Sequence, residues 1–186
     1  MPLEAIIEQL SRRLLRLDTG SLAELRRMET GGPGPLAYWR LAVECGFIDE
    51  PPDRWMPIVR ILAVLTPKGD RLPSDRLHDP KRRLGSVLCD GGDPGWQAGQ
   101  EPRPFLSETR LARLLAAPAV SRAQAVMRIA RMLAANRDRA SGLDCREVAA
   151  LLLFSDARDN PQKIAKAYYR RLDFAARQSE PEEVEQ

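Results

Sequence analysis

The sequence predicts an all-α protein made of two small helical bundles joined by a Pro/Gly-rich connection. Apolar residues recur at helical spacing along most of the chain, and several of these periodic segments begin at residues that favour helix caps. No segment shows the alternating polar and apolar pattern of a half-buried strand. With 186 residues, of which 44% are hydrophobic and 30% charged, the chain is long enough to bury a sizeable core.

The first half of the chain contains five predicted helices. They cover residues 3–17, 21–28, 36–45, 54–65 and 81–89. Ser21 and Glu24 have the spacing of a capping box, in which each side chain satisfies an orphan backbone amide, and Gly46 ends the third helix. The looser stretch before the fifth helix, residues 67–80, contains three prolines.

The second half contains four predicted helices. They cover residues 108–117, 121–136, 144–154 and 160–178. Ser107 is the expected N-cap of the first, Ser121 and Gln124 form a second capping box, and Asp144 begins the third. Asn160 precedes a proline at the first helical position, which is a common helix start.

These elements predict a division of the chain into four parts. Residues 1–90 form an N-terminal bundle, 91–106 a loop or connection, 107–178 a C-terminal bundle, and 179–186 an acidic tail that we expect to be disordered. The interval from 90 to 106 contains four glycines and three prolines with little periodicity, so it is either a domain connection or a functional surface.

The charge balance is more basic than its sum indicates. The chain has 29 Lys and Arg residues against 26 Asp and Glu residues, a formal charge of +3, and 25 of the basic residues are arginine. Four glutamates lie in the acidic tail, so residues 1–178 contain 29 basic against 22 acidic side chains, or +7. Because guanidinium groups bind phosphate in a bidentate manner, this composition is compatible with a polyanionic partner. A GC-rich genome is the alternative reason for high arginine usage.

Catalysis, cofactors and metals find little support in the sequence. His78 is the only histidine, and its Pro- and Asp-rich surroundings predict a solvated loop residue. Cys145, near a helix start, is the one residue available as a nucleophile with a depressed pKa, although a small buried residue is the simpler interpretation. The sequence has no Cys-x-x-Cys motif, and its glycine-rich segments lack a P-loop lysine. We therefore expect a non-enzyme without cofactor or metal.

Three features of the sequence bear on where the protein is located. The longest apolar stretch, Ile58 to Leu65, is interrupted by Arg60 and is too short to span a bilayer, and no signal peptide is visible. Three widely spaced cysteines suit a reducing compartment. We expect a soluble, cytoplasmic protein.

The basic residues of the second half have a pattern of their own. Seven arginines and only two acidic residues lie between Ser107 and Arg139. Arg128 and Arg131 fall opposite the apolar stripe of their helix, and Arg110 and Arg113 have the same spacing on the preceding helix. Packed together, these helices would form a positive groove suited to phosphate oxygens. The alternative is a solvated face with scattered ion pairs.

Several different short motifs follow one another along the body of the chain. The first joins Leu17-Asp18-x-Gly20-Ser21-x-Ala23-x-Leu25-Arg26-Arg27 to Tyr38-Trp39-Arg40-Leu41. There follow Leu84-Gly85, Ser107-Glu108-x-Arg110-Leu111-x-Arg113-Leu114-Leu115, Arg128-Ile129-Ala130-Arg131-Met132-Leu133, and Lys163-Ile164-Ala165-Lys166-x-Tyr168-Tyr169. Over residues 3–172 this set resembles the CasB family, the small subunit of Cascade, the type I-E CRISPR surveillance complex.

The resemblance implies a non-catalytic protein of two helical bundles, present as a pair along the belly of Cascade. Its basic surfaces would contact the crRNA and the target DNA strand and help hold the displaced single strand, next to the CasC backbone and the CasA large subunit. By motif position the contacts would fall on Arg27, Arg54, Arg110, Arg122 and Arg131, with Arg26 and Lys163 as further members. Helical spacing adds Arg113 and Arg128. A regulatory or adaptor protein that binds acidic protein partners is the alternative function.

Overall fold

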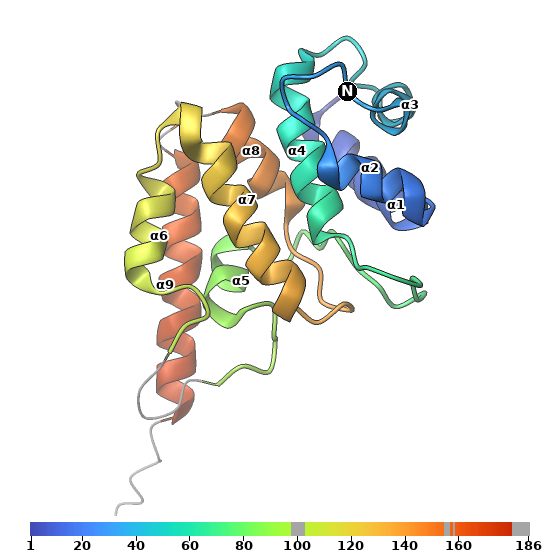
Figure 1. Ribbon diagram of the computed structural model, residues 1–186. Coiled ribbons are helices and arrows are strands. Elements are labelled where there is room, and N and C mark those ends of the chain that lie inside the picture. Colours follow the sequence, from blue (N-terminus) through green and yellow to red (C-terminus); the bar gives the residue numbers. More distant parts are fainter. Residues whose placement is uncertain (98–102, 155–156, 158, 180–186) are drawn as a thin grey trace, which may run out of the picture.

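The computed structural model describes residues 1–97, 103–154, 157 and 159–179. Nine α-helices lie within these residues (Figure 1): α1 (Leu3–Arg16), α2 (Thr19–Arg27), α3 (Leu36–Cys45), α4 (Pro52–Leu65), α5 (Leu84–Asp90), α6 (Glu108–Leu115), α7 (Ala119–Asn136), α8 (Cys145–Leu153) and α9 (Asp159–Ser179). The predicted acidic tail lies almost entirely outside the described residues.

The predicted all-α class is confirmed. Among the described residues there is no strand, and the only sheet-like feature is a single bridge between His78 and Leu143. None of the helices in the described ranges combines the length and the apolar character needed to cross a membrane.

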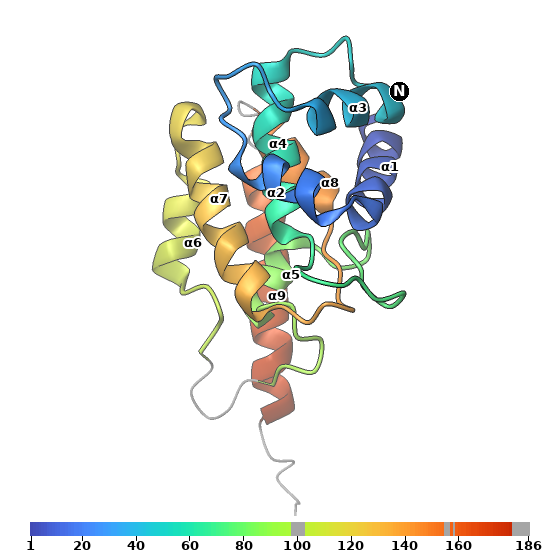
Figure 2. The ribbon, with the colours of Figure 1, turned by 45° about the vertical axis from the view of Figure 1, so that its right-hand side comes forward.

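One continuous hydrophobic core runs through both halves of the chain. α4 packs against α2 on one side and against α7 and α8 on the other, and α1 contacts α3 and α8 (Figures 1 and 2). Buried residues from α1 and from α9, such as Leu10 and Tyr168, belong to the same cluster. α5, which the sequence assigns to the N-terminal bundle, packs most extensively against α9. The separation into two bundles at residues 91–106 is therefore not confirmed.

Two helices begin earlier than the predicted capping boxes, because a preceding residue takes the N-cap position. Asp18, not Ser21, caps α2, and its carboxylate accepts the Ser21 backbone N–H at 2.9 Å. α7 begins after Pro118, two residues before Ser121, because proline fixes a suitable φ for the position before a helix. The predicted Asp144 cap is confirmed, since its carboxylate accepts the Arg146 N–H at 3.0 Å.

Helices α5 and α9 make a very close backbone contact at Gly85. A Cβ atom added to Gly85 would lie 2.0 Å from the Ile164 carbonyl oxygen and 2.8 Å from the Tyr168 backbone nitrogen. These distances leave no room for any side chain, so only glycine allows α9 to lie against α5. The contact fixes the start of α5 against the first half of α9.

A buried arginine joins the two long connections that cross below α4. Arg137, the C-cap of α7, donates hydrogen bonds to the carbonyl oxygens of Leu65 (3.0 Å), Arg76 (3.2 Å) and Ser141. Backbone bonds between the same connections, such as Arg76 N–H to the Arg139 oxygen at 2.9 Å, complete the junction. The end of α4 is thereby tied to the end of α7.

Replacing Gly85 with alanine should destabilise the protein. The added methyl group must displace α9 backbone, and overpacking of this kind costs about 1–3 kcal/mol. Gly31→Ala is the matched control, because no atom lies within 4 Å of the position of its Cβ. Urea unfolding of the two variants measures the difference. Equal free energies of unfolding would show that α5 and α9 do not meet at Gly85.

Candidate functional site

Four of the predicted arginines come together on α6 and α7. A groove of about 550 Å³ lies between these helices, with Arg110 and Arg113 on its α6 side and Arg128 on its α7 side. Arg131 and Arg128 line a neighbouring hollow of about 260 Å³ between α7 and α4. Arg128 lines both, so the two hollows are neighbours along α7. We call Arg110, Arg113, Arg128 and Arg131 the α6–α7 arginine surface.

Each of the two helices buries its apolar face against the core, so these arginines are exposed to solvent. On α6, Leu111 and Leu114 are buried against the core, so Arg110 and Arg113 face solvent. On α7 the buried face consists of Val126, Met127, Ala130 and Leu133. Arg128 and Arg131 are exposed on the opposite face, as the apolar stripe predicts.

The electrostatics of this surface are one-sided. Within the described part of the chain, none of its four guanidinium groups makes an ion pair or a hydrogen bond, and neither hollow is lined by a described acidic side chain. The floor of the groove is apolar, with Leu114, Ile129 and Met132. The arrangement offers many unsatisfied N–H donors over a short distance, which suits the oxygen atoms of a polyanion.

Two other predicted arginines have structural partners. Arg26 donates to the carbonyl oxygens of Ala63 (2.9 Å) and Thr66 (2.8 Å), and burial lowers the pKa of its guanidinium. Arg122 is buried and donates to Ala117 and Leu151 carbonyl oxygens at 3.1 and 3.4 Å. In the structure these guanidinium groups serve backbone acceptors, and the phosphate contacts of Arg26 and Arg122 stay predictions.

Arg54, Arg27 and Lys163 lie apart from the α6–α7 arginine surface. Arg54 is exposed but donates to the Leu153 carbonyl oxygen, so it also caps the C-terminal end of α8. Arg27 is exposed at the end of α2 and lines neither hollow. Lys163 is exposed on α9 and lines a different cleft.

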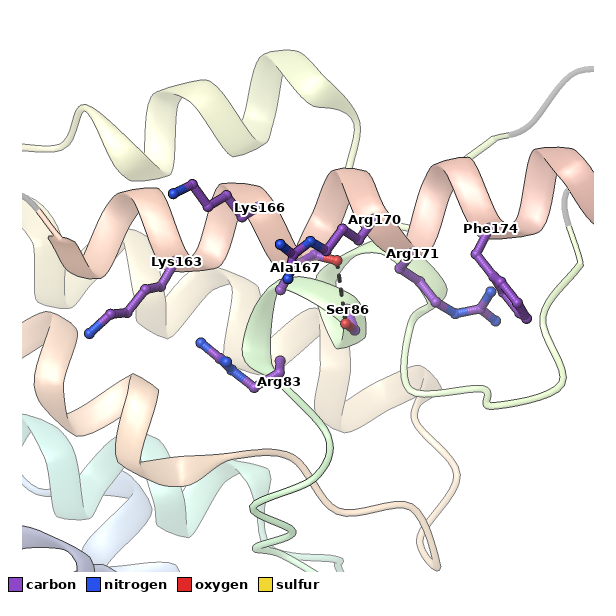
Figure 3. Close-up of a pocket in the computed structure, with 8 residues that line it drawn as sticks. All are labelled: Arg83, Ser86, Lys163, Lys166, Ala167, Arg170, Arg171 and Phe174. Carbon is purple, nitrogen blue, oxygen red and sulfur yellow. Dashed lines mark hydrogen bonds between the residues drawn. The ribbon is translucent and has the colours of Figure 1, made fainter.

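Most of this second cleft was not predicted from the sequence. Besides Lys163, its basic lining residues are Arg83, Lys166, Arg170 and Arg171 (Figure 3). Lys163, Lys166 and Arg170 have the spacing i, i+3 and i+7, which places them on one face of a helix. That spacing was a usable signal. The contribution of Arg83 was not visible, because it depends on the packing of α5 against α9.

Cys145 does not have the depressed pKa that a nucleophile needs. It is fully buried, and burial raises the pKa of its thiol to about 12. Cys45 and Cys89 are also buried, with thiol pKa values raised by burial to about 11 and about 12. The simpler sequence interpretation, a small buried residue, is the one that the structure supports.

The expectation of a solvated His78 is wrong. Only 9% of its side chain is exposed, and its Nδ1 accepts the Cys145 backbone N–H at 3.1 Å. The imidazole thus satisfies an orphan amide at the start of α8. In the described ranges, no group of three or more His, Cys, Asp or Glu residues is placed to hold a metal ion.

Comparisons of the chain with protein-family models, with curated proteins and with solved structures each gave no match.

Replacing the buried Arg122 should destabilise the protein, whereas the same replacement of the exposed Arg113 should not. Arg122→Met leaves buried carbonyl oxygens without donors, and we expect it to lower the free energy of unfolding by about 2 kcal/mol or more. Arg113→Met keeps the aliphatic stem on an exposed position, so the change should stay within about 0.5 kcal/mol. Urea unfolding measures both. If Arg122→Met is as stable as Arg113→Met, the buried role of Arg122 is wrong.

Proposed function

We propose that this chain is a non-catalytic small subunit of a type I-E CRISPR Cascade effector complex. In this role it binds the backbones of crRNA and of target and displaced DNA and stabilises the R-loop in antiviral defence. The observation that best supports the proposal is the α6–α7 arginine surface. Its four exposed guanidinium groups come from two of the helices whose motifs resemble CasB, and no described acidic side chain lines either hollow.

The chemistry of the surface fits a phosphate backbone better than a base edge. Guanidinium forks bind phosphate oxygens, and such contacts position a nucleic acid without reading its sequence. R-loop formation nearly balances the DNA duplex that is opened against the heteroduplex that forms, so modest backbone contacts can tip it. A subunit that supplies such contacts needs neither an active site nor sequence preference.

The proposed role also defines partners. The protein would act in the cytoplasm, next to the CasC backbone and the CasA large subunit, with a second copy of itself in the complex. Co-expression with these subunits and a guide RNA tests this directly. The expected result is that the chain co-purifies with the RNA-loaded complex, and a complex that assembles fully without it would contradict the assignment.

One feature favours a second candidate, an adaptor that binds an acidic protein partner. The apolar floor of the groove, formed by Leu114, Ile129 and Met132 between arginines, would accept an acidic amphipathic helix. Purified protein separates the two functions. Bound RNA shifts the absorbance ratio toward 260 nm, whereas a protein partner does not.

Removing the α6–α7 arginine surface should weaken binding to RNA of any sequence. In a variant with all four arginines changed to glutamine, the log–log salt slope should flatten by about 0.7 for each phosphate of a single strand that the variant no longer neutralises. Fluorescence anisotropy across a salt series measures both the affinity and the slope.

The matched control removes the same charge elsewhere. Arg12, Arg13, Arg16 and Arg40 belong to α1 and α3 and line neither hollow. Changing these four to glutamine should reduce the slope much less. An equal reduction in the two quadruple variants would show that only net charge matters, and that the α6–α7 arginine surface is not the binding site.

A further inference from the structure

A second basic feature follows the exposed face of α9. Lys163, Lys166 and Arg170 follow one another along the helix, and Phe174 continues the same row four residues later (Figure 3). They line a cleft of about 420 Å³ whose other wall comes from Arg83 and Ser86, at the start of α5. We call these residues the α9 cleft. It shares no lining residue with the α6–α7 arginine surface.

The basic residues of the α9 cleft are of two kinds, those that are paired with a carboxylate and those that are not. Arg83 pairs with Glu147, and Arg171 pairs with the buried carboxylate of Asp90 at 2.9 Å, so both are held as parts of the wall. Lys163, Lys166 and Arg170 make no ion pair or hydrogen bond to any described residue, and no described acidic residue lines the cleft. Three cations in a row therefore have no ion-pair partner within the described part of the chain. The carboxylates of Glu147 and Asp173, which line adjacent hollows with them, are paired with Arg83 and Arg177 instead.

An aromatic ring stands at the end of this row. The Phe174 side chain is 56% exposed; several other large apolar side chains of the described residues are exposed too, and Phe174 is the aromatic side chain that lines the cleft. The Arg171 guanidinium lies 6.0 Å from the Phe174 ring centroid and 5.2 Å from the Trp96 ring, so it steadies the aromatic end of the cleft. Arg171 is itself anchored by the Trp96 carbonyl oxygen at 2.7 Å. Phe174 thus offers apolar ring surface to solvent beside the anchored Arg171.

We propose that the α9 cleft is a second nucleic-acid site, selective for unpaired strands. Phosphates lie along Lys163, Lys166 and Arg170, and one unpaired base stacks on Phe174. From residue 163 to residue 174 the helix rises about 16 Å, which suits a short segment of single strand. In a duplex each base is already stacked on its neighbours, so the ring has no base to receive.

The α9 cleft takes its class of ligand from the proposed function but depends on different residues. A row of cations alone would accept any polyanion, including free polyphosphate. The exposed ring is what adds a preference for bases, because stacking is available to every base but not to a bare phosphate chain. The site therefore predicts two separable contributions, one from charge and one from stacking.

The stacking contribution is tested with two single strands of equal length, oligodeoxythymidylate and its abasic counterpart. The unchanged protein should bind the thymidylate strand at least about fivefold more tightly, the lower end of the effect of one stacked base. Phe174→Leu should abolish most of this ratio, as measured by fluorescence anisotropy. Phe154→Leu is the matched control, because Phe154 is similarly exposed (52%) at the end of α8 and lines no part of the cleft.

The charge contribution is tested with Lys166→Gln/Arg170→Gln. This double variant should weaken binding of both strands and lower the log–log salt slope by about 1.4. Arg13→Gln/Arg16→Gln removes the same charge from α1 as a control. Binding of a duplex of the same length should weaken as well, because the row of cations accepts any polyanion.

The outcomes distinguish the α9 site from the proposed function. If the α9 variants bind both strands like the unchanged protein while the quadruple α6–α7 variant no longer binds, the α9 site is overturned and the proposed function stands. Reduced affinity and a reduced thymidylate preference in the α9 variants support the inference. If neither set of variants changes binding, both are overturned. Equal affinity of the unchanged protein for thymidylate and abasic strands overturns the stacking role of Phe174.

Discussion

The arrangement of this protein depends on a buried cation, the guanidinium group of Arg137. Burial lowers its pKa, and a charged group in such a place is tolerated only when its donors are satisfied. Carbonyl oxygens from the end of α4, from the 67–80 connection and from the connection before α8 supply this. Gly92 packs so closely on the Arg137 side chain that a Cβ there would lie 2.3 Å from its Cγ. Four separate segments thus converge on one side chain.

This convergence positions the basic surfaces. Arg137 ends α7 and holds the last turn of α4, so α4 and α7 stay side by side with the hollow of Arg128 and Arg131 between them. On the far side, the Gly85 contact and the pairing of Arg171 with Asp90 hold α9 against α5. The chain uses arginine in two ways: buried or half-buried residues such as Arg26 and Arg122 bind backbone carbonyls, whereas those of the α6–α7 arginine surface keep their donors in solvent.

The sequence predicted what is local and missed what is not. The spacing of apolar residues within one segment is enough to predict that the segment is a helix and roughly where it extends. The all-α class and the exposure of Arg128 and Arg131 were therefore predictable. Helix starts were less so, because Asp18 competes with Ser21 for the same role at the start of α2. The burial of Arg122 depends on the end of α8, 29 residues away, and the α9 cleft depends on α5, some 80 residues away. The apolar period of a single helix does not show contacts between segments so far apart in the sequence.

In the proposed function, exposed arginines on α6 and α7 bind nucleic-acid backbone while buried arginines hold the frame. Arginine footprinting with phenylglyoxal, read peptide by peptide with and without single-stranded RNA, distinguishes these two classes of side chain. We expect modification of Arg110, Arg113, Arg128 and Arg131 in the free protein and protection by RNA, with Arg122 and Arg137 unmodified in both states. Equal modification of those four residues with and without RNA, or protection only on α1, would contradict this division.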